Sequence, residues 1–415
     1  MIRIAYHTLG CKVNQYESEM IRESLERAGF ATVPFNSPAE VYIINTCSVT
    51  GVADSKSRAA VRRALKLNPD AFVVVSGCYA ELEPAQIAEI EGVGLVVPND
   101  EKDAIPERII ARFAVNHSEQ QTTRPRMRTR AVVKVQDGCD QFCSYCVIPY
   151  ARSGKASRPI DDVIAELKSL ADFGYKEVVL AGIRLGSYQN EDYKLPELIK
   201  EASLIEGIER IRLSSIEPWE VDDALLDAMD SPKVCRHLHI PLQSGDDDTL
   251  RRMNRPYDTV QYRSIIDKVR GRIPGIGITT DVIVGFPSET DEAFENTSKM
   301  IQDIDFSRLH VFRYSARKRT KACDLPDPVD ANIKKTRAER LTELGILGMK
   351  RFASSLIGDT LDVLVETATP NDLKGFADNY VEVTFPGDLS LRGQVVRVRI
   401  NGINEDGGAF GEVTD

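Results

Sequence analysis

The sequence predicts an α/β protein with three domains: an open parallel sheet, a partial β/α barrel of six units, and a small antiparallel β-barrel. Length is the first observation behind this prediction, since 415 residues correspond to two or three domains of ordinary size. The second is that strand-like and helix-like segments alternate over most of the chain, which is typical of parallel sheets. The third is a change to short alternating strands punctuated by glycines after residue 356.

The first domain, residues 1–116, is expected to be the open parallel sheet. Its strand candidates are Ile2–Thr8, Val41–Asn45, Phe72–Ser76 and Leu95–Val97. Its helix candidates are Gln15–Ala28, Val52–Leu67, Pro84–Ile90 and Ala104–Phe113. The first of these helices has apolar residues at helical spacing and ends at Gly29, which is a usual helix stop. Residues 117–130 are polar, lack any apolar period and are expected to be a linker.

Residues 131–355 are expected to form the barrel, which has six β/α units instead of the usual eight. Its strand candidates are Ala131–Gln136, Glu177–Ile183, Arg210–Ser215, His237–Leu242, Ile276–Val284 and Ser307–Tyr314. The helices between them are expected at Ile160–Phe173, Leu195–Ser203, Val221–Met229, Tyr257–Val269 and Glu289–Ile301. A long helix, Asn332–Ser355, follows the last strand.

The third domain, residues 356–415, is expected to be a small antiparallel barrel. Its strand candidates are Asp362–Glu366, Tyr380–Thr384, Gln394–Ile400 and Phe410–Val413. The alternation within these short runs, together with the glycines between them, is the pattern of a closed all-β module.

Composition excludes several classes of protein. Hydrophobic residues make up 42% of the chain, which is too many for a disordered protein, and the net charge of −10 argues against a simple basic nucleic-acid-coating protein. Eight cysteines are too few for a disulfide scaffold. Residues 1–7 lack the pattern of a signal peptide, and no apolar run is long enough to span a membrane. We therefore expect a cytoplasmic protein whose clustered cysteines are metal ligands or catalytic thiols.

The strongest motif places Cys139, Cys143 and Cys146 in a Cys-x3-Cys-x2-Cys loop directly after a predicted barrel strand. Active sites of such barrels lie at the carboxyl ends of their strands. Three thiolates can hold three irons of a four-iron, four-sulfur (4Fe–4S) cluster and leave the fourth iron open. A structural zinc site would normally use a fourth protein ligand, and no further Cys or His lies nearby in the sequence.

A second set of cysteines is dispersed in the sequence. Cys11, Cys47 and Cys78 each follow the end of a predicted strand of the first domain. The carboxyl ends of parallel strands share one edge of the sheet, so these three thiols should converge in space and could hold a second cluster with an open iron. The alternative is that they are ordinary buried cysteines. Cys235 and Cys323 fit neither set and are expected to be non-ligands.

These motifs resemble a known family. The Cys139–Cys146 loop resembles that of the radical S-adenosylmethionine (SAM) superfamily. Thr8-Leu-Gly-Cys-Lys-Val-Asn-Gln-Tyr-Glu-Ser18, Asn45-Thr-Cys-Ser-Val-Thr50 and Gly77-Cys-Tyr-Ala80 resemble the methylthiotransferase family, as do Leu213-Ser-Ser-Ile-Glu-Pro218, His239-Ile-Pro-Leu-Gln-Ser-Gly245, Gly285-Phe-Pro287 and Val311–Ser315. The segment Thr8–Ser18 is most similar to the branch of the family that acts on N6-threonylcarbamoyladenosine in tRNA. The resemblance spans the chain and implies a flavodoxin-like first domain, a radical SAM barrel and a C-terminal TRAM domain.

The resemblance implies the chemistry as well. The cluster on Cys139, Cys143 and Cys146 would bind SAM and supply one electron that generates a 5′-deoxyadenosyl radical. The cluster on Cys11, Cys47 and Cys78 would carry the sulfur, and a methylthio group would be transferred to carbon 2 of the adenine at position 37, in the tRNA anticodon loop. A low-potential donor such as flavodoxin or ferredoxin is implied as a partner. The alternatives are isopentenyladenosine or a ribosomal-protein aspartate as substrate, or a non-catalytic metal-containing RNA-binding protein.

The same resemblance implies further residues at the SAM site, and the sequence departs from the family at two positions. Tyr145 would lie beside the adenine of SAM, and the other implied contacts, at predicted strand ends, are Gly182, Ser214, Glu217 and Gln243. Ser288 and Arg319 stand where relatives usually have Gly. Because Gly readily adopts a positive φ, we expect these two changes to affect the local loops.

Charge is unevenly distributed along the chain. Residues 356–415 carry 4 basic and 11 acidic side chains, whereas residues 308–351 carry 12 basic and 5 acidic ones. The segment around the predicted linker adds Arg124, Arg126, Arg128 and Arg130. An RNA substrate needs positive surface, which we therefore expect beside the barrel and not on the acidic third domain.

Overall fold

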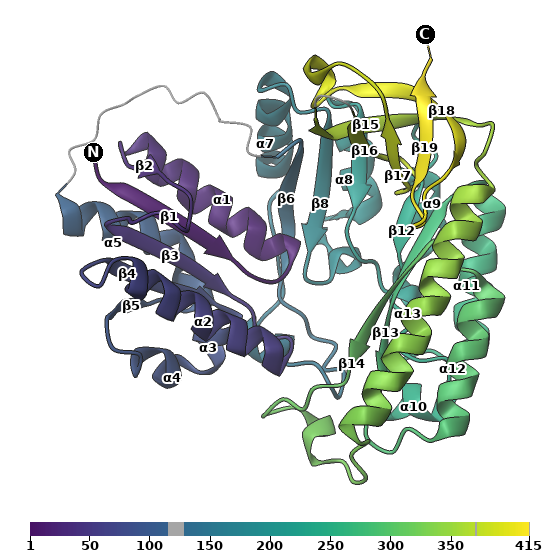
Figure 1. Ribbon diagram of the computed structural model, residues 1–415, viewed down its shortest axis with the longest axis horizontal. Helices are drawn as coiled ribbons and strands as arrows, with labels where there is room; N and C mark the ends of the chain where they lie inside the picture. The colour runs from purple at the N-terminus through teal and green to yellow at the C-terminus, as the bar shows by residue number, and fades with distance from the viewer. Residues whose placement is uncertain (115–127, 370–371, 415) are drawn as a thin grey trace. The chain divides into compact units, whose positions relative to one another are not determined.

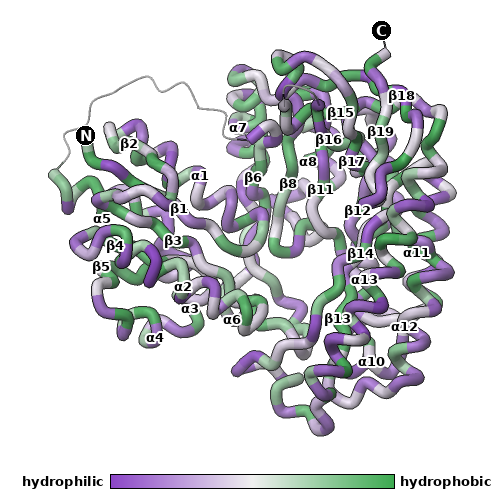
Figure 2. The backbone as a smooth tube through the Cα atoms, in the orientation of Figure 1, coloured by the Kyte–Doolittle hydropathy of each residue, from purple (hydrophilic) through white to green (hydrophobic). Residues whose placement is uncertain are grey.

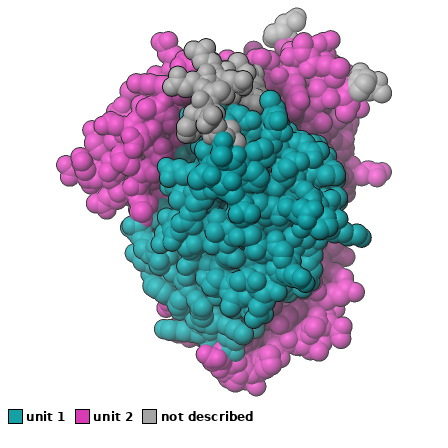
Figure 3. All heavy atoms as spheres, turned by 90° about the vertical axis from the view of Figure 1, so that its left-hand side faces the viewer, with its two compact units in different colours: residues 1–125, 137–155, 315–323 teal, residues 126–136, 156–314, 324–415 magenta. Residues whose placement is uncertain are grey.

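The computed structural model describes residues 1–114, 128–369 and 372–414 (Figure 1). The described chain forms two compact units, which are coloured separately in Figure 3. Unit 1 comprises residues 1–125, 137–155 and 315–323, and unit 2 comprises residues 126–136, 156–314 and 324–415. Both units are therefore assembled from several separate stretches of the chain.

Unit 1 is built on a five-stranded parallel sheet with the strand order β2-β1-β3-β4-β5. This is the order of flavodoxin-like folds. The strands are β1 (Arg3–Thr8), β2 (Ala31–Thr32), β3 (Val41–Thr46), β4 (Phe72–Gly77) and β5 (Val93–Val96). The helices are α1 (Lys12–Arg27), α2 (Gly51–Leu67), α3 (Cys78–Leu82), α4 (Pro84–Ala88), the 3₁₀ helix η1 (Asn99–Ala104), α5 (Ile105–Phe113) and α6 (Ile148–Ala151).

The central strand β3 shows why the sheet is buried on both faces. All six of its residues are buried, as expected for a strand of a parallel sheet covered by helices on both sides. Tyr42 and Ile44 belong to the apolar cluster that includes residues of α2, whereas Ile43 belongs to the cluster that includes residues of α1 and α5. Successive side chains of a strand point to opposite faces, so an uninterrupted apolar run is needed here.

The barrel of unit 2 contains the six parallel strands expected from the sequence. They are β6 (Arg130–Asp137), β8 (Glu177–Gly182), β11 (Arg210–Leu213), β12 (His237–His239), β13 (Gly277–Val284) and β14 (Arg308–Arg313). They form one sheet with the order β11-β8-β6-β7, where β7 is Ala156–Ser157, and a second with the order β12-β13-β14. A parallel bridge between Ser215 and His239 connects the two sheets, so the six strands follow one another as in a partial barrel.

Helices cover the outside of this partial barrel. The main ones are α7 (Ile160–Asp172), α8 (Leu195–Ser203), α9 (Asp223–Ala228), α10 (Asp247–Arg252), α11 (Thr259–Arg272), α12 (Asp291–Ile304) and the long α13 (Ala331–Ser354). Strands and helices share one large apolar core. Figure 2 shows the hydrophobic colouring of β8, whose first five residues are buried.

The C-terminal part of unit 2 is a closed barrel with the strand order β15-β16-β17-β19-β18. Its strands are β15 (Thr360–Ala368), β16 (Leu373–Ala377), β17 (Glu382–Phe385), β18 (Val395–Ile403) and β19 (Ala409–Val413). The sequence predicted four of the five and missed β16. Gly375 interrupts the apolar alternation by which this strand could have been recognised. The structure requires glycine there, because a Cβ would lie 2.0 Å from the carbonyl oxygen of Leu364 on β15.

A buried carboxylate links the partial barrel to the C-terminal barrel within unit 2. Glu177, on β8, has no exposed surface and forms ion pairs of 2.8 Å with both Arg210 and Arg212 on β11. The guanidinium groups of these arginines also donate hydrogen bonds to the C-terminal barrel, for example to the carbonyl oxygens of Phe376 and Ala377, both at 3.0 Å. Burial alone would raise the pKa of Glu177, but Arg212 and Arg210 outweigh burial and hold its pKa below the usual range.

We predict that Glu177→Gln lowers the free energy of unfolding by about 3–5 kcal/mol, because it leaves two buried arginines without their carboxylate. A carboxyl group with a lowered pKa stabilises the folded state fully above its unfolded pKa of about 4.3, and this contribution is lost as the pH falls through the lowered folded value. Denaturant titrations should therefore show a difference between the two proteins that is largest above about pH 4.3 and shrinks in acid. The control is Glu209→Gln, which removes an exposed ion pair with Lys176 and should change stability by less than about 1 kcal/mol. Equal losses in the two variants would contradict the prediction.

Candidate functional site

The three dispersed cysteines converge at one edge of the sheet of unit 1. Thr8, at the end of β1, pairs with Asn45 on β3, and Thr46 pairs with Gly77 at the end of β4, so the three strands end in register. Cys47 and Cys78 follow directly, and Cys11 is the residue before α1. Cys47 and Cys78 are buried, whereas Cys11 is exposed. The three thiols are close enough for Cys78 and Cys11 to affect the pKa of Cys47, as the sequence led us to expect.

Two glycines allow the backbone to approach these cysteines closely. Gly10 and Gly77 both have φ of +97°, in the region that favours glycine. A Cβ on Gly10 would lie 2.9 Å from the Cβ and 3.1 Å from the Sγ of Cys47. A Cβ on Gly77 would lie 2.3 Å from the carbonyl oxygen of Thr46. The turns that carry the cysteines can therefore be formed only by glycine at these two positions.

The two buried thiols are poor acids when no metal is bound. Burial raises the pKa of Cys47 to about 11. Burial also raises the pKa of Cys78, although the positive charges of Arg152 and Lys102 partly oppose it. Metal ligation requires thiolates, so binding of iron here would release protons and compensate the buried negative charge.

Buried polar atoms next to these cysteines lack partners. Asn45 Oδ1 and Ser76 Oγ each lie two residues before a cysteine, and neither forms a hydrogen bond with another described residue. The Nε of Arg152 is in the same condition. Buried polar atoms are nearly always satisfied in native proteins, so this region fits a group that the protein holds when loaded. Three thiols and these polar atoms suit an iron–sulfur cluster.

The second set of cysteines lies in the loop that follows β6. Cys143 is buried, while Cys139 and Cys146 are partly exposed, and Cys146 N donates a hydrogen bond to Cys143 O at 3.0 Å. The preceding Gly138 has φ of +74°, and a Cβ there would lie 1.5 Å from the carbonyl oxygen of Gly154. The loop is thus pressed against the turn after α6 and can begin only with glycine.

The segment 315–323 completes the surroundings of both cysteine sets in unit 1. Arg317 forms an ion pair with Asp54 at 2.6 Å and donates a hydrogen bond to the Oγ of Ser48, which follows Cys47. Ala322 N donates to the carbonyl oxygen of Ser144 in the other cysteine loop at 2.8 Å. A single short segment thus contacts the neighbours of both sets.

The geometry of the thiols differs from that of a single-ion site. Across the part of the chain that the structure describes, no three His, Cys, Asp or Glu side chains gather as they would around one metal ion. The corners of a 4Fe–4S cluster bind one thiolate each, so its ligands are spaced more widely than those of a zinc ion. Cys235 belongs to unit 2, where it is buried beside Arg212, and Cys323 is exposed.

The implied SAM contacts divide between the units. Tyr145 is in the cysteine loop of unit 1 and is partly exposed. The others lie in unit 2 at the carboxyl ends of strands. Gly182 N donates a hydrogen bond to Ser214 Oγ at 3.4 Å, which brings the ends of β8 and β11 together. Gln243 has φ of +64° and bridges to β13, since its carbonyl oxygen accepts a hydrogen bond from Ile283 N at 2.9 Å.

Glu217, the remaining implied contact, is already engaged in an ion pair. Its carboxylate pairs with Arg255, whose side chain is buried. The guanidinium of Arg255 lies 4.9 Å from the ring centroid of Trp219 and 5.1 Å from that of Tyr257. The sequence did not reveal this arginine, because a single Arg in a helix–loop segment has no pattern that marks it as buried.

Ser288 and Arg319 both adopt the positive φ that the family glycines would supply. Their φ angles are +60° and +75°. Ser288 N donates a hydrogen bond to Asp327 O at 2.8 Å, and Arg319 Nη2 donates one to Leu82 O at 3.0 Å. The loops thus keep a left-handed conformation at both positions, at a cost of about 1–2 kcal/mol each that these hydrogen bonds help to offset.

Part of the basic surface expected beside the barrel is neutralised within the protein. Arg124 and Arg126 lie outside the described residues. Arg130 is part of β6, forms a 2.5 Å ion pair with Glu366 and has its guanidinium 5.2 Å from the ring centroid of Phe376, so it is no free linker cation. Several cations of residues 308–351 are also ion-paired within the protein, namely Arg317, Arg337, Arg340 and Arg351.

Family models agree with the two parts of this site. Residues 3–98 match the model described as "Uncharacterized protein family UPF0004", and residues 133–301 match that of the radical SAM superfamily. The parallel sheet, the partial barrel and the cysteine loop at the end of its first strand define a radical SAM enzyme. Among solved structures, the radical SAM methyltransferase TsrM from Kitasatospora setae, with cobalamin and a 4Fe–4S cluster bound, matches with a TM-score of 0.58 and 15% identity. That match covers 78% of this chain and 77% of the other, and it supports the fold.

Full-length relatives define the family. The threonylcarbamoyladenosine tRNA methylthiotransferase MtaB of Bacillus subtilis (strain 168) is 40% identical over 96% of this chain and 94% of its own. The protein of the same name from Chlamydia pneumoniae is 39% identical over 98% and 96%. A tRNA-2-methylthio-N(6)-dimethylallyladenosine synthase of Thermoanaerobacter sp. (strain X514) is 36% identical over 95% and 90%. The chain belongs to the radical SAM tRNA methylthiotransferase family, and the relatives at 39–40% identity are MtaB proteins.

Proposed function

We propose that this enzyme transfers a methylthio group to carbon 2 of N6-threonylcarbamoyladenosine at position 37 of tRNA, using two SAM-dependent steps and two 4Fe–4S clusters. The observation that carries the proposal is that unit 1 contains two separate sets of three cysteines, Cys11/Cys47/Cys78 and Cys139/Cys143/Cys146. Each set lacks a fourth protein ligand in the sequence around it, which leaves one iron open to SAM or to sulfur. A tRNA substrate and a flavodoxin- or ferredoxin-type electron donor place the proposed activity in the cytoplasm.

When bound, the two clusters would supply the electron that cleaves SAM and the sulfur that is transferred. The chain's own residues hold and shield them. Gly10, Gly77 and Gly138 let the backbone turn tightly at the cysteines, and burial of Cys47 and Cys78 excludes water from the inner wall of the first site. At the strand ends of unit 2, Gly182 lets Gln136 and Leu185 pack closely, since a Cβ there would lie 3.0 Å from Gln136 Oε1, and Ser214 and Gln243 would offer polar atoms for SAM. Arg255 fixes the carboxylate of Glu217.

The choice of threonylcarbamoyladenosine rests on the relatives. The curated MtaB proteins that match at 39–40% identity act, by their names, on this nucleoside. The dimethylallyladenosine synthase at 36% identity is similar enough for that nucleoside to be the competing substrate. Because both substrates require the same chemistry at carbon 2, the cysteine sites do not discriminate between them.

A face of helix α2 offers the positive surface that tRNA needs. Lys56, Arg62, Arg63 and Lys66 are exposed and lie within about a third of the circumference of the helix. None of them forms an ion pair with another described residue. Asp54 is the one acidic residue of α2, and it is already paired within unit 1. Since α2 begins four residues after Cys47, Lys56 lies nearest the first cysteine set, and the other three cations extend away from it along the helix.

We predict that the anaerobically purified and reconstituted protein binds about eight irons per chain, as two 4Fe–4S clusters require. A Cys139→Ala/Cys143→Ala/Cys146→Ala variant and a Cys11→Ala/Cys47→Ala/Cys78→Ala variant should each retain about half of this iron. The control is Cys235→Ala/Cys323→Ala, which should retain all of it. About four irons in the unaltered protein, or no loss in either triple variant, would rule out the two-cluster assignment.

We predict that a strain lacking the gene loses 2-methylthio-N6-threonylcarbamoyladenosine from its tRNA and regains it when the gene is restored. The measurement is mass spectrometry of tRNA nucleosides. The methylthiolated isopentenyladenosine level is the internal control and should not change. Loss of that nucleoside instead would assign the enzyme to the other branch. Restoration with either triple cysteine variant should fail.

We predict that replacing Lys56, Arg62, Arg63 and Lys66 together by Gln weakens tRNA binding. The slope of log K against log salt concentration should become less negative by up to about 3, since each lost phosphate contact removes roughly 0.7–0.9. The matched control replaces four exposed but ion-paired arginines, namely Arg263, Arg272, Arg340 and Arg351, and changes the net charge equally. Equal weakening by the two sets would mean that only net charge matters and that α2 does not contact tRNA.

A further inference from the structure

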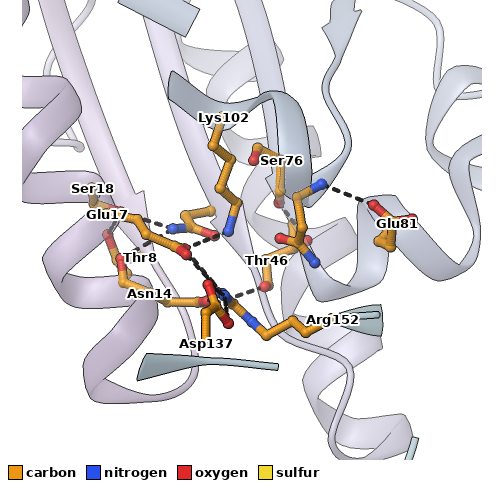
Figure 4. Close-up of polar contacts among 12 residues, drawn as sticks. Thr8, Asn14, Glu17, Ser18, Thr46, Ser76, Glu81, Lys102, Asp137 and Arg152 are labelled. Carbon is orange, nitrogen blue, oxygen red and sulfur yellow. Dashed lines mark hydrogen bonds and ion pairs between the residues drawn. The ribbon is translucent and has the colours of Figure 1, made fainter. Parts of the chain in front are cut away.

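Figure 4 shows a buried polar network around Arg152 in unit 1. Its centre is the ion pair of Arg152 with Glu17, in which Nη1 and Nη2 of the arginine donate to Oε1 at 2.8 Å and Oε2 at 3.0 Å. Lys102 Nζ donates to the same carboxylate at 2.5 Å. These three residues are 4%, 6% and 3% exposed, so the network is removed from water, where such charges need full compensation.

Arg152 connects the segments that carry both sets of cysteines. Glu17 is on α1, which follows Cys11 directly. Asp137, two residues before Cys139, accepts hydrogen bonds from Arg152 Nη1 at 2.8 Å. Arg152 itself follows α6, which begins two residues after Cys146. One guanidinium thus joins the helix after Cys11 to both ends of the Cys139–Cys146 loop.

The same residue lies next to Cys78. Val147 and Ala151 of the α6 region pack with Cys78 and Leu82 in one apolar cluster, so α6 lies against α3. At the end of α6, the carbonyl oxygen of Ala151 accepts a hydrogen bond from Asn99 Nδ2 at 2.6 Å. Arg152, the next residue along the chain, places its guanidinium beside the Cys78 side chain.

One N–H donor of Arg152 is left without an acceptor. A guanidinium has five N–H groups, and the four on Nη1 and Nη2 are engaged by Glu17, Asp137 and Asn14. The fifth, on Nε, is buried and makes no hydrogen bond of its own with the described residues, although the guanidinium as a whole lies beside the Cys78 thiol. Leaving such a donor unsatisfied costs about 1–3 kcal/mol, so an acceptor is expected when the site is loaded.

We propose, on the basis of the function proposed above, that Arg152 is a positioning residue whose Nε donates a hydrogen bond to sulfur of the cluster held by Cys11, Cys47 and Cys78. Its Nη groups meanwhile fix the start of α1 and the Cys139–Cys146 loop relative to that cluster. Hydrogen bonds to sulfur and nearby positive charge stabilise the reduced, more negative state of an iron–sulfur cluster and so raise its potential. Glu17, which holds Arg152 and Lys102, is negatively charged and therefore lowers the potential of the cluster.

The test uses the full chain with Cys139→Ala/Cys143→Ala/Cys146→Ala, so that only the first cluster remains. Iron content and the midpoint potential, from a dithionite titration followed by electron paramagnetic resonance, are compared for Arg152→Gln, Arg152→Lys and Glu17→Gln. In Arg152→Gln the ratio of reduced to oxidised cluster at a fixed potential should fall about tenfold, which corresponds to about 59 mV for a one-electron couple. In Arg152→Lys, which keeps the charge but lacks Nε, this ratio should fall less. In Glu17→Gln the ratio should rise.

The matched control is Arg22→Gln, which removes another arginine of unit 1 with a buried side chain, paired with Glu19 and Glu26 on α1. It should cost stability without changing the potential, which separates a structural effect from an effect on the cluster. Full iron with an unchanged potential in both Arg152 variants would overturn the proposal for Arg152. Loss of iron from both Arg152 variants, while Arg22→Gln keeps its iron, would support it. Absence of iron already in the parent triple variant would instead overturn the two-cluster function.

Discussion

The parallel pairing of β1, β3 and β4 is the constraint on which the candidate site depends. Parallel strands of equal register end together, and each connection must then leave the sheet at the same edge. Cys11, Cys47 and Cys78 are separated by more than thirty residues in sequence, yet this edge brings them to one place. The glycines at 10 and 77 make the geometry possible, because their neighbours leave no room for a side chain.

The distribution of charge in this acidic chain follows from burial. Arginine forms most of the interior ion pairs, since its planar fork can bind a carboxylate and several carbonyl oxygens at once. Arg212 does this between β8 and the C-terminal barrel, and Arg152 does it among the cysteine-bearing segments of unit 1. Many of the basic residues are thereby neutralised internally. Among the cations without an ion pair in the described residues are Lys56, Arg62, Arg63 and Lys66, which lie on one face of α2.

Much of the fold could be predicted from the sequence, because apolar periodicity marks elements that are buried in regular ways. The strands β3, β4, β8 and β13 begin or end within a residue or two of their expected bounds. The strand β16 was missed because Gly375 breaks its pattern, although the neighbouring carbonyl of Leu364 requires that glycine. The two cysteine sets could be proposed from the sequence, one from its Cys-x3-Cys-x2-Cys spacing and the other from positions that follow predicted strands. Arg152, Glu17 and Arg255 could not, since a charged residue that becomes buried looks in sequence like any solvent-exposed one.

The discontinuous make-up of unit 1 has a consequence for biosynthesis. Its three stretches end with residues 315–323, which leave the ribosome only after about three-quarters of the chain has been made. Arg317 and Ala322 in that stretch secure the residues beside Cys47 and within the Cys139–Cys146 loop. Domains usually fold in order as they emerge, and contacts between distant segments form slowly. The N-terminal sheet is therefore synthesised long before the segment that contacts the neighbours of both cysteine sets.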